Sequence, residues 1–238
     1  MSAGRLRLFP LNTVLFPGAS LQLHVFEPRY KQMISECLDD GEAFGVCLIR
    51  EGDEAGDPAV DPHEIGTTAE ISDVTPLPLG RLHITTCGKR RFKITNIISR
   101  EPYLLCEVEY LEDRATNRKA LDELRRQLTS EFNEYLRLLV EYSGAKCHVE
   151  IPEDAVSASY VVGDALQVAD GVKQRLLEIG DAADRLRVEI GFLRRLLPQL
   201  RAMLERKHAQ PQPERNDPPG GEFRSQQERY FGKAFSNN

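Results

Sequence analysis

The sequence lacks any uninterrupted apolar run near the roughly 20 residues that a membrane-spanning helix needs. Its opening segment, Met1 to Pro10, lacks the charged-then-apolar order of a secretory signal peptide. The five cysteines are odd in number and show no paired spacing, so no disulfide framework is indicated. Together these absences predict a reduced, cytoplasmic protein with no membrane partner.

Nucleotide-binding and nucleophile motifs are also missing. A phosphate-binding loop ends in Gly-Lys followed by Ser or Thr, and neither Gly88-Lys89 nor Gly232-Lys233 meets that pattern. The sequence contains no G-x-G-x-x-G and no G-x-S-x-G. Ser143 and Lys146 have the bare S-x-x-K spacing, but Gly144 between them would break the helix that such a nucleophile requires. We therefore expect no enzyme activity and no cofactor.

No metal site or strongly anion-binding surface is indicated either. The histidines are scattered, and none lies one helical turn from another, so no pair shares a helix face. A formal net charge of -6 disfavours a dedicated nucleic-acid binder, because neutralising phosphates requires a positive surface. We expect neither a metal nor a nucleic acid as a partner.

One basic run provides the strongest signal for the alternative, an RNA-binding protein. It comprises Lys89, Arg90, Arg91 and Lys93. Strand alternation would place Arg90 on one side and the other three on the opposite side, and no aromatic cluster accompanies them for base stacking. A solvated strand face, with Arg91 as an anchoring side chain, is the favoured interpretation.

The region up to about residue 112 is predicted to be mostly β. Period-two alternation of apolar and polar residues, typical of half-buried strands, recurs in the runs 21–25, 82–86, 91–94 and 104–110. Turns are predicted at Gly18, Gly80 and Gly88. One helix is expected to begin at Pro28 and end at Gly41, with Phe26 and Tyr30 in the core. The segment 51–64 is expected to be a solvated loop.

After Asp113 the apolar residues take a helical period. Helices are predicted at about 121–139, 153–168, 171–179 and 181–207. The last carries a seam whose apolar residues alternate spacings of four and three: Leu186, Ile190, Leu193, Leu197, Leu200 and Leu204. Pro198 should kink this helix. Phe192 widens the seam, which favours a bundle helix and leaves a homo-oligomer through this helix as the alternative.

These patterns predict an α+β protein with three parts: a β-rich domain at 1–114, a helical bundle at 115–208 with a long terminal helix, and a disordered tail at 209–238.

Several segments, taken in order, resemble the N-terminal substrate-binding domain of the Lon ATP-dependent proteases. They are Leu8–Gly18, Phe26–Tyr30, Ile65–Thr67, Gly88–Ile94, Phe132–Leu139 and Leu176–Leu186. The resemblance implies a β pseudo-barrel related to the PUA fold, with one inserted helix and a helical bundle after it. It extends from residue 6 to about 207, and no residue matches the ATPase or Ser–Lys peptidase sites of Lon.

The resemblance therefore implies a stand-alone, non-catalytic module that binds unfolded or degron-bearing polypeptides. Such a module would serve as a protease adaptor or a chaperone-like binder. A sheet edge along 104–110 is one expected place for a client to pair as an extra strand. The candidate partner-binding residues are Arg90, Leu104, Tyr110 and Phe192.

Overall fold

The computed structural model describes residues 3–52, 60–144 and 149–209. The predicted tail beyond Ala209 lies outside the described residues. The strands are β1 (Ala3–Leu11), β2 (Ser20–Val25), β3 (Phe44–Glu51), β4 (Asp61–Pro62), β5 (Ile65–Leu77), β6 (Arg81–Ser99) and β7 (Leu104–Tyr110). The helices are α1 (Pro28–Asp40), α2 (Arg118–Ser143), α3 (Ala155–Ala165), α4 (Asp170–Glu178) and α5 (Ala182–Ala209), with a 3-10 turn, η1, at Pro78–Gly80. The expected α+β fold is confirmed.

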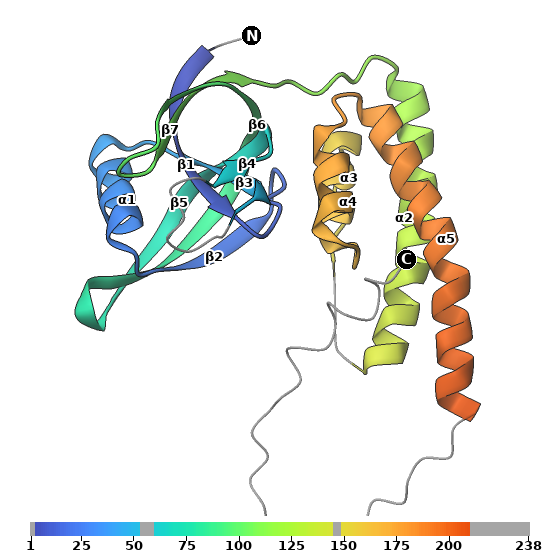
Figure 1. The fold of residues 1–238 in the computed structure, drawn as a ribbon. Coiled ribbons are helices and arrows are strands. Elements are labelled where there is room, and N and C mark those ends of the chain that lie inside the picture. The colour runs from blue at the N-terminus through green and yellow to red at the C-terminus, as the bar shows by residue number, and fades with distance from the viewer. Residues whose placement is uncertain (1–2, 53–59, 145–148, 210–238) are drawn as a thin grey trace, which may run out of the picture.

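The strands form a closed ring from which a three-stranded arm projects (Figure 1). Antiparallel neighbours run in the order β1-β7-β6-β5-β3, and a parallel pairing of β1 with β3 closes the ring. Beyond the ring, the outer halves of β5 and β6 continue as a hairpin, and β2 pairs with β6 on the other side. We call these three paired segments, 20–25, 70–77 and 81–87, the β arm.

Strand β6 is one strand of 19 residues, although the sequence predicted two strands joined by a turn at Gly88. Gly88 lies inside the strand, and the loop between β1 and β2 passes close to its backbone. A Cβ atom at this position would lie 2.2 Å from the Phe16 carbonyl oxygen. The glycine therefore permits a close backbone approach rather than a turn. The predicted turns at Gly18 and Gly80 are confirmed, and both have positive φ.

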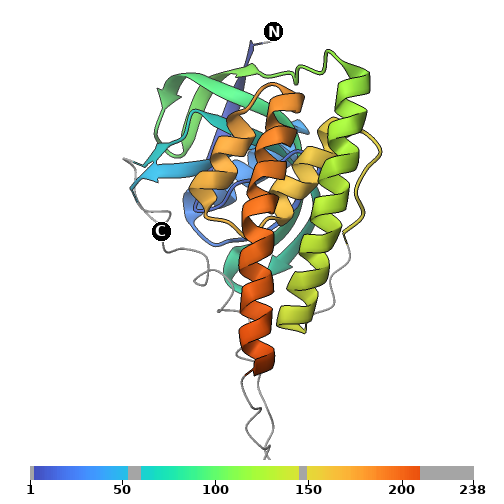
Figure 2. The same ribbon diagram turned by 90° about the vertical axis from the view of Figure 1, so that its right-hand side faces the viewer.

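The four later helices form a layer beside the barrel (Figure 2). Helices α2 and α5 are long parallel neighbours, with Arg194 against Glu131 and Lys207 against Tyr142. Helices α3 and α4 lie between them and the barrel. Every residue of the predicted α5 seam is buried. Helix α5 continues through Pro198 without a break. Residues 53–59 of the predicted loop at 51–64 lie outside the described residues. At the ends of this segment, Glu51 belongs to β3, Val60 is buried and Asp61–Pro62 form a short strand.

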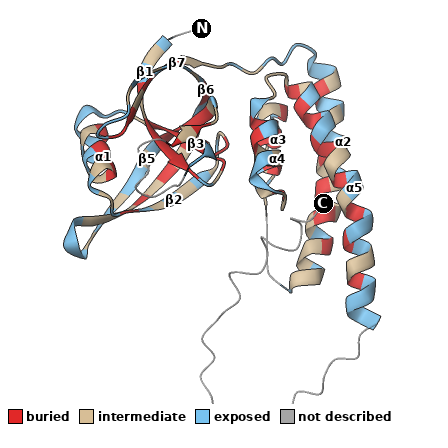
Figure 3. Ribbon diagram, viewed as in Figure 1, coloured by how far each residue is buried: buried red, intermediate tan, exposed pale blue. Residues whose placement is uncertain are grey.

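The barrel and the helices share one of three hydrophobic core clusters, and Figure 3 shows the buried residues of these elements in red. Val14, Phe16 and Leu48 of the barrel join the cluster formed by the four helices. The Phe16 ring approaches Gly163 of α3 so closely that a Cβ there would lie 3.2 Å from it. Barrel and helices therefore pack against each other across the predicted boundary near residue 114.

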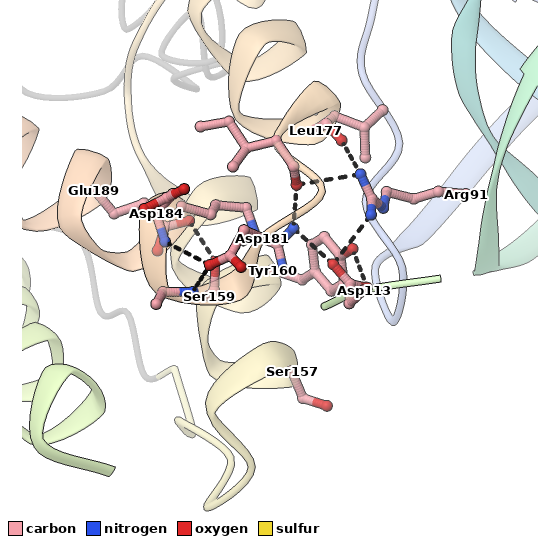
Figure 4. A network of polar contacts seen from close by, with 12 residues as sticks. Arg91, Asp113, Ser157, Ser159, Tyr160, Leu177, Asp181, Asp184 and Glu189 are labelled. Atoms are coloured by element: carbon pink, nitrogen blue, oxygen red, sulfur yellow. Dashed lines mark hydrogen bonds and ion pairs between the residues drawn. The ribbon is translucent and has the colours of Figure 1, made fainter. Parts of the chain in front are cut away.

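A buried polar network links the two halves of the chain (Figure 4). Asp113, in the linker to α2, accepts hydrogen bonds from Arg91 Nη2 at 3.1 Å and Arg185 Nη1 at 2.9 Å. Tyr160 donates its hydroxyl to the same carboxylate at 2.6 Å, and its ring lies under the Arg185 guanidinium. We call Arg91, Asp113, Tyr160 and Arg185 the clamp. The anchoring role predicted for Arg91 is confirmed, because Arg91 also donates to the Leu177 carbonyl.

Candidate polypeptide-binding surface

The β arm has one apolar face, which the strand register defines. Three cross-strand rows place apolar side chains on it, and they alternate with polar rows on the opposite face. The rows are Leu21–Thr86–Ile71, Leu23–Ile84–Val74 and Val25–Leu82–Pro76. Val25 and Ile84 are buried against α1, whereas Leu21, Leu23, Ile71, Val74 and Leu82 are only partly covered.

Leu79 is placed at the tip of the arm, within η1, and 89% of it is exposed. Its φ of 66° lies in the left-handed region, which leucine seldom adopts. An exposed apolar side chain in a strained turn contributes little to folding. We call Leu79 and the five partly covered residues of the apolar face (Leu21, Leu23, Ile71, Val74, Leu82) the arm surface.

Phe26 adds a second exposed apolar side chain near the arm. It follows β2 directly and is 53% exposed, so the expected core position is wrong, although Tyr30 is buried as predicted. The Phe26 ring lies beside His24, with 5.7 Å between the ring centroids. Phe26 therefore belongs to the polar face of the arm, opposite the leucines of β2.

The expected open edge at 104–110 is wrong, because β7 pairs with β1 on one side and β6 on the other. The barrel closure that covers β7 depends on strands distant in sequence, which alternation alone does not reveal. Strand β2 instead pairs only with β6 among the described strands. The arm therefore carries a free sheet edge; the two-residue strand β4, which pairs only with β3, ends the sheet elsewhere.

The basic run on β6 is largely neutralised by neighbouring acids. Lys89 lies 3.4 Å from Glu70, Arg90 3.1 Å from Glu112, and Lys93 3.5 Å from Glu64. A shift of register opposite Thr68 places Lys89 and Arg90 both at the surface, while Arg91 is buried. The simple alternation expected for this run is therefore wrong, and the paired charges leave little positive surface for phosphates.

The four residues predicted to contact a partner are not gathered at one place. Arg90 and Tyr110 do meet, with the guanidinium carbon 4.5 Å from the ring centroid. Leu104 is buried in the barrel core, so its side chain is inaccessible in this structure. Phe192 lies on α5, partly covered by the bundle and by Arg195. Only the first two form a common surface.

The polar groups of the clamp hold parts of the structure together. Glu189 extends the network through Ser159, whose hydroxyl donates to its Oε1 at 2.9 Å. Burial raises the pKa of Glu189 to about 8, despite the nearby Arg185. Burial likewise raises the pKa of Tyr160. Because the clamp groups bind one another and backbone carbonyls, we interpret this network as the joint between barrel and helices.

The part of the chain that the structure describes contains no group of three or more His, Cys, Asp or Glu side chains arranged to hold a metal ion. Nor does it contain a helix long and apolar enough to cross a bilayer. The arm surface is thus the strongest candidate site.

The chain is similar to known sequences over most of its length. The family model for the ATP-dependent protease La (LON) substrate-binding domain matches residues 5–195. A Lon protease from Syntrophomonas wolfei is 26% identical over 192 residues, which cover 76% of this chain and 22% of that protein. A Lon protease from Flavobacterium johnsoniae is 35% identical over 111 residues, 45% of this chain and 13% of that protein. The chain thus spans about a fifth or less of these relatives.

Two solved structures share the fold. A Lon N-terminal domain protein from Xanthomonas campestris is 28% identical, with a TM-score of 0.59 over 79% of this chain and 98% of that one. The N-terminal domain of a Mycobacterium avium complex Lon protease is 19% identical, with a TM-score of 0.56 over 80% of this chain and 98% of that one. The second likeness supports the fold alone.

Proposed function

This chain belongs to the family of Lon substrate-binding domains, and from that premise we propose that it captures non-native polypeptides through the arm surface. The observation that carries the proposal is the arm itself. It ends in a leucine that is 89% exposed and bears a half-covered apolar face behind it. Segments that are apolar and unfolded expose the side chains that such a surface can bury.

Binding a polypeptide requires no catalytic group from this chain. The matched family is a substrate-binding domain, and the sequence carries neither a phosphate-binding loop nor a nucleophile motif. We propose that the chain is non-catalytic and presents clients to a separate protease or chaperone, as an adaptor would. Its partners in this proposal are unfolded or degron-bearing polypeptides, bound without nucleotide and with modest affinity, because a disordered client loses conformational entropy on binding.

The RNA-binding alternative has less support. Lys89, Arg90 and Lys93 each lie near a carboxylate, and Arg91 is committed to the clamp. Phosphate binding would have to break these ion pairs, and its affinity would fall steeply with added salt. Apolar capture should instead change little with salt.

The first test is a titration of a labelled, permanently unfolded polypeptide and a labelled RNA at low and high salt. We compare the native chain with Leu79→Asn, because asparagine tolerates positive φ and leaves the tip polar. Burying a leucine contributes about 1.5–3 kcal/mol, so the variant should bind the polypeptide at least about tenfold more weakly. Its melting temperature should not fall.

A matched control is Ile98→Asn, which removes an apolar side chain that is 40% exposed near the opposite end of β6. This variant should bind the polypeptide like the native chain. Equal binding by Leu79→Asn and the native chain, or salt-sensitive RNA binding without polypeptide binding, would contradict the proposal.

A further inference from the structure

We propose that a client binds the outer edge of β2 as an added strand, so that capture is partly through main-chain hydrogen bonds. This inference rests on the proposed function and specifies its binding mode. The occupant is an extended segment of a non-native polypeptide, apolar at alternate positions, with an acidic residue at the end beside the arm tip.

The direction of the β2 amides follows from one side-chain contact. The Thr86 hydroxyl donates to the Leu21 carbonyl at 3.0 Å, so that carbonyl faces β6. In an extended strand, the N–H and C=O of one residue point to the same side, and successive residues alternate. Leu21, Leu23 and Val25 therefore bond to β6. The main-chain groups of Ser20, Gln22 and His24 face outward.

These outward groups form a regular edge that no other described strand pairs with. The register of β2 with β6 runs from Ser20 to Val25 without a shift, and the strand contains neither proline nor lysine. Natural proteins usually blunt free edges with prolines, charges or bulges. The free side of β5 in the same arm follows that rule, since it has a register shift between Ile71 and Asp73 and carries Pro76. The contrast within one arm indicates that the β2 edge is kept open for pairing.

The side chains flanking this edge suit an extended, partly apolar segment. On one face, an added strand would lie beside Leu21 and Leu23, which are half-covered. On the other face it would lie beside Gln22, His24 and the exposed ring of Phe26. Alternate side chains of the client would therefore meet an apolar and a polar surface in turn.

The arm tip adds charge complementarity at one end. Arg81 Nε donates to the Pro78 carbonyl rather than to a carboxylate, and the Lys31 ammonium lies close to Gly80. Two cationic side chains thus stand just beyond the end of β2, because Val25 pairs with Leu82. An acidic residue at that end of the client would be favoured over a basic one.

The test uses a short synthetic peptide with alternating leucine and threonine and one acidic end. Gln22→Pro removes an outward N–H without removing a bond to β6, a position at which strands tolerate proline. It should weaken binding about tenfold, because an interstrand hydrogen bond is lost and the ring obstructs the edge. Gln22→Ala, which keeps the N–H, should bind normally. A second peptide, N-methylated at alternate residues, should bind the native chain as weakly as the first binds Gln22→Pro.

Hydrogen exchange of the native chain gives a readout that does not depend on the variants. Peptide binding should slow exchange of the Ser20, Gln22 and His24 amides. Unchanged exchange at these amides, with full binding by Gln22→Pro and weak binding by Leu79→Asn, would overturn strand addition and leave polypeptide capture standing. If no unfolded probe binds at all, the proposed function fails. Concentration-dependent self-association that Gln22→Pro abolishes would assign the edge to a second copy of the chain and also overturn the proposal.

Discussion

At the scale of single residues, the contact between barrel and helices depends on buried charged side chains. Arg91 and Arg185 bring two cations to one carboxylate, and their side chains are almost completely buried. Glu189, also buried, is the one acid of the network whose pKa is raised to about 8. A neutral Glu189 at physiological pH avoids an additional buried charge.

This protonation predicts a pH dependence of stability. Because the folded pKa of about 8 exceeds the unfolded value of about 4.3, folding takes up a proton between these values. The stabilisation of the folded state by this bound proton is fully present below the unfolded pKa and is lost as pH rises through the folded pKa. The free energy of unfolding should therefore fall across this window, by up to about 1.4 kcal/mol per pH unit.

Denaturant unfolding of Glu189→Gln at several pH values checks this dependence. The variant should lose that part of the slope, because glutamine does not ionise. Glu205→Gln changes an exposed glutamate of the same helix and should keep the native slope. Identical slopes for native chain and Glu189→Gln would show that Glu189 is already ionised in the folded state.

At the scale of elements, α5 is the longest of the described helices and carries the seam that the sequence predicted. Leu193 lies in its middle and is completely buried in the shared core. Leu193→Ala should lower the free energy of unfolding by about 2–5 kcal/mol, because the cavity adds to the lost burial. Val188→Ala, at an exposed position on another face of α5, should change the free energy of unfolding by less than about 0.5 kcal/mol. Chemical denaturation of both variants provides the comparison.

The elements that the sequence predicted well are those with a strong local signal. Pro28 and Gly41 mark both ends of α1, and the apolar period places α2 to α5 within a few residues. Features that depend on distant contacts were missed. Gly88 looks like a turn residue until Phe16 is placed against it, and β7 looks like an edge until the ring closes.

The candidate site was missed for the same reason. Leu79 sits in a Pro-Leu-Pro-Leu-Gly segment, where a turn is evident but its exposure is not. That leucine between turn residues was the available signal. The free edge of β2 became visible only when every other strand had been assigned its neighbours.

At the scale of the whole molecule, the shared core and the clamp predict that barrel and helices unfold together. Asp113→Ala leaves two arginines buried without their carboxylate and should cost about 3–5 kcal/mol. Amide exchange in β6 and in α5 should report the same loss, because one cooperative unit contains both. Glu112→Ala breaks only an exposed ion pair with Arg90 and should cost about 0–1 kcal/mol.

Separate responses of β6 and α5 to Asp113→Ala would instead identify two domains divided near residue 114. Such a result would restore the organisation that the sequence alone predicts, and it would confine the clamp to a contact between independently stable parts.

Strand β6 gives this architecture a mechanical consequence. The strand begins at Arg81, beside the arm tip, and carries Arg91 of the clamp near its middle. In the proposed function, a client drawn toward a protease would pull on the arm along this strand. Because β2 pairs with β6 in antiparallel register, the ladder bonds between these two strands would be loaded together, as in shear, rather than broken one after another as in peeling. From β6 the load would pass to the helices through the Arg91 guanidinium, which donates to the Leu177 carbonyl.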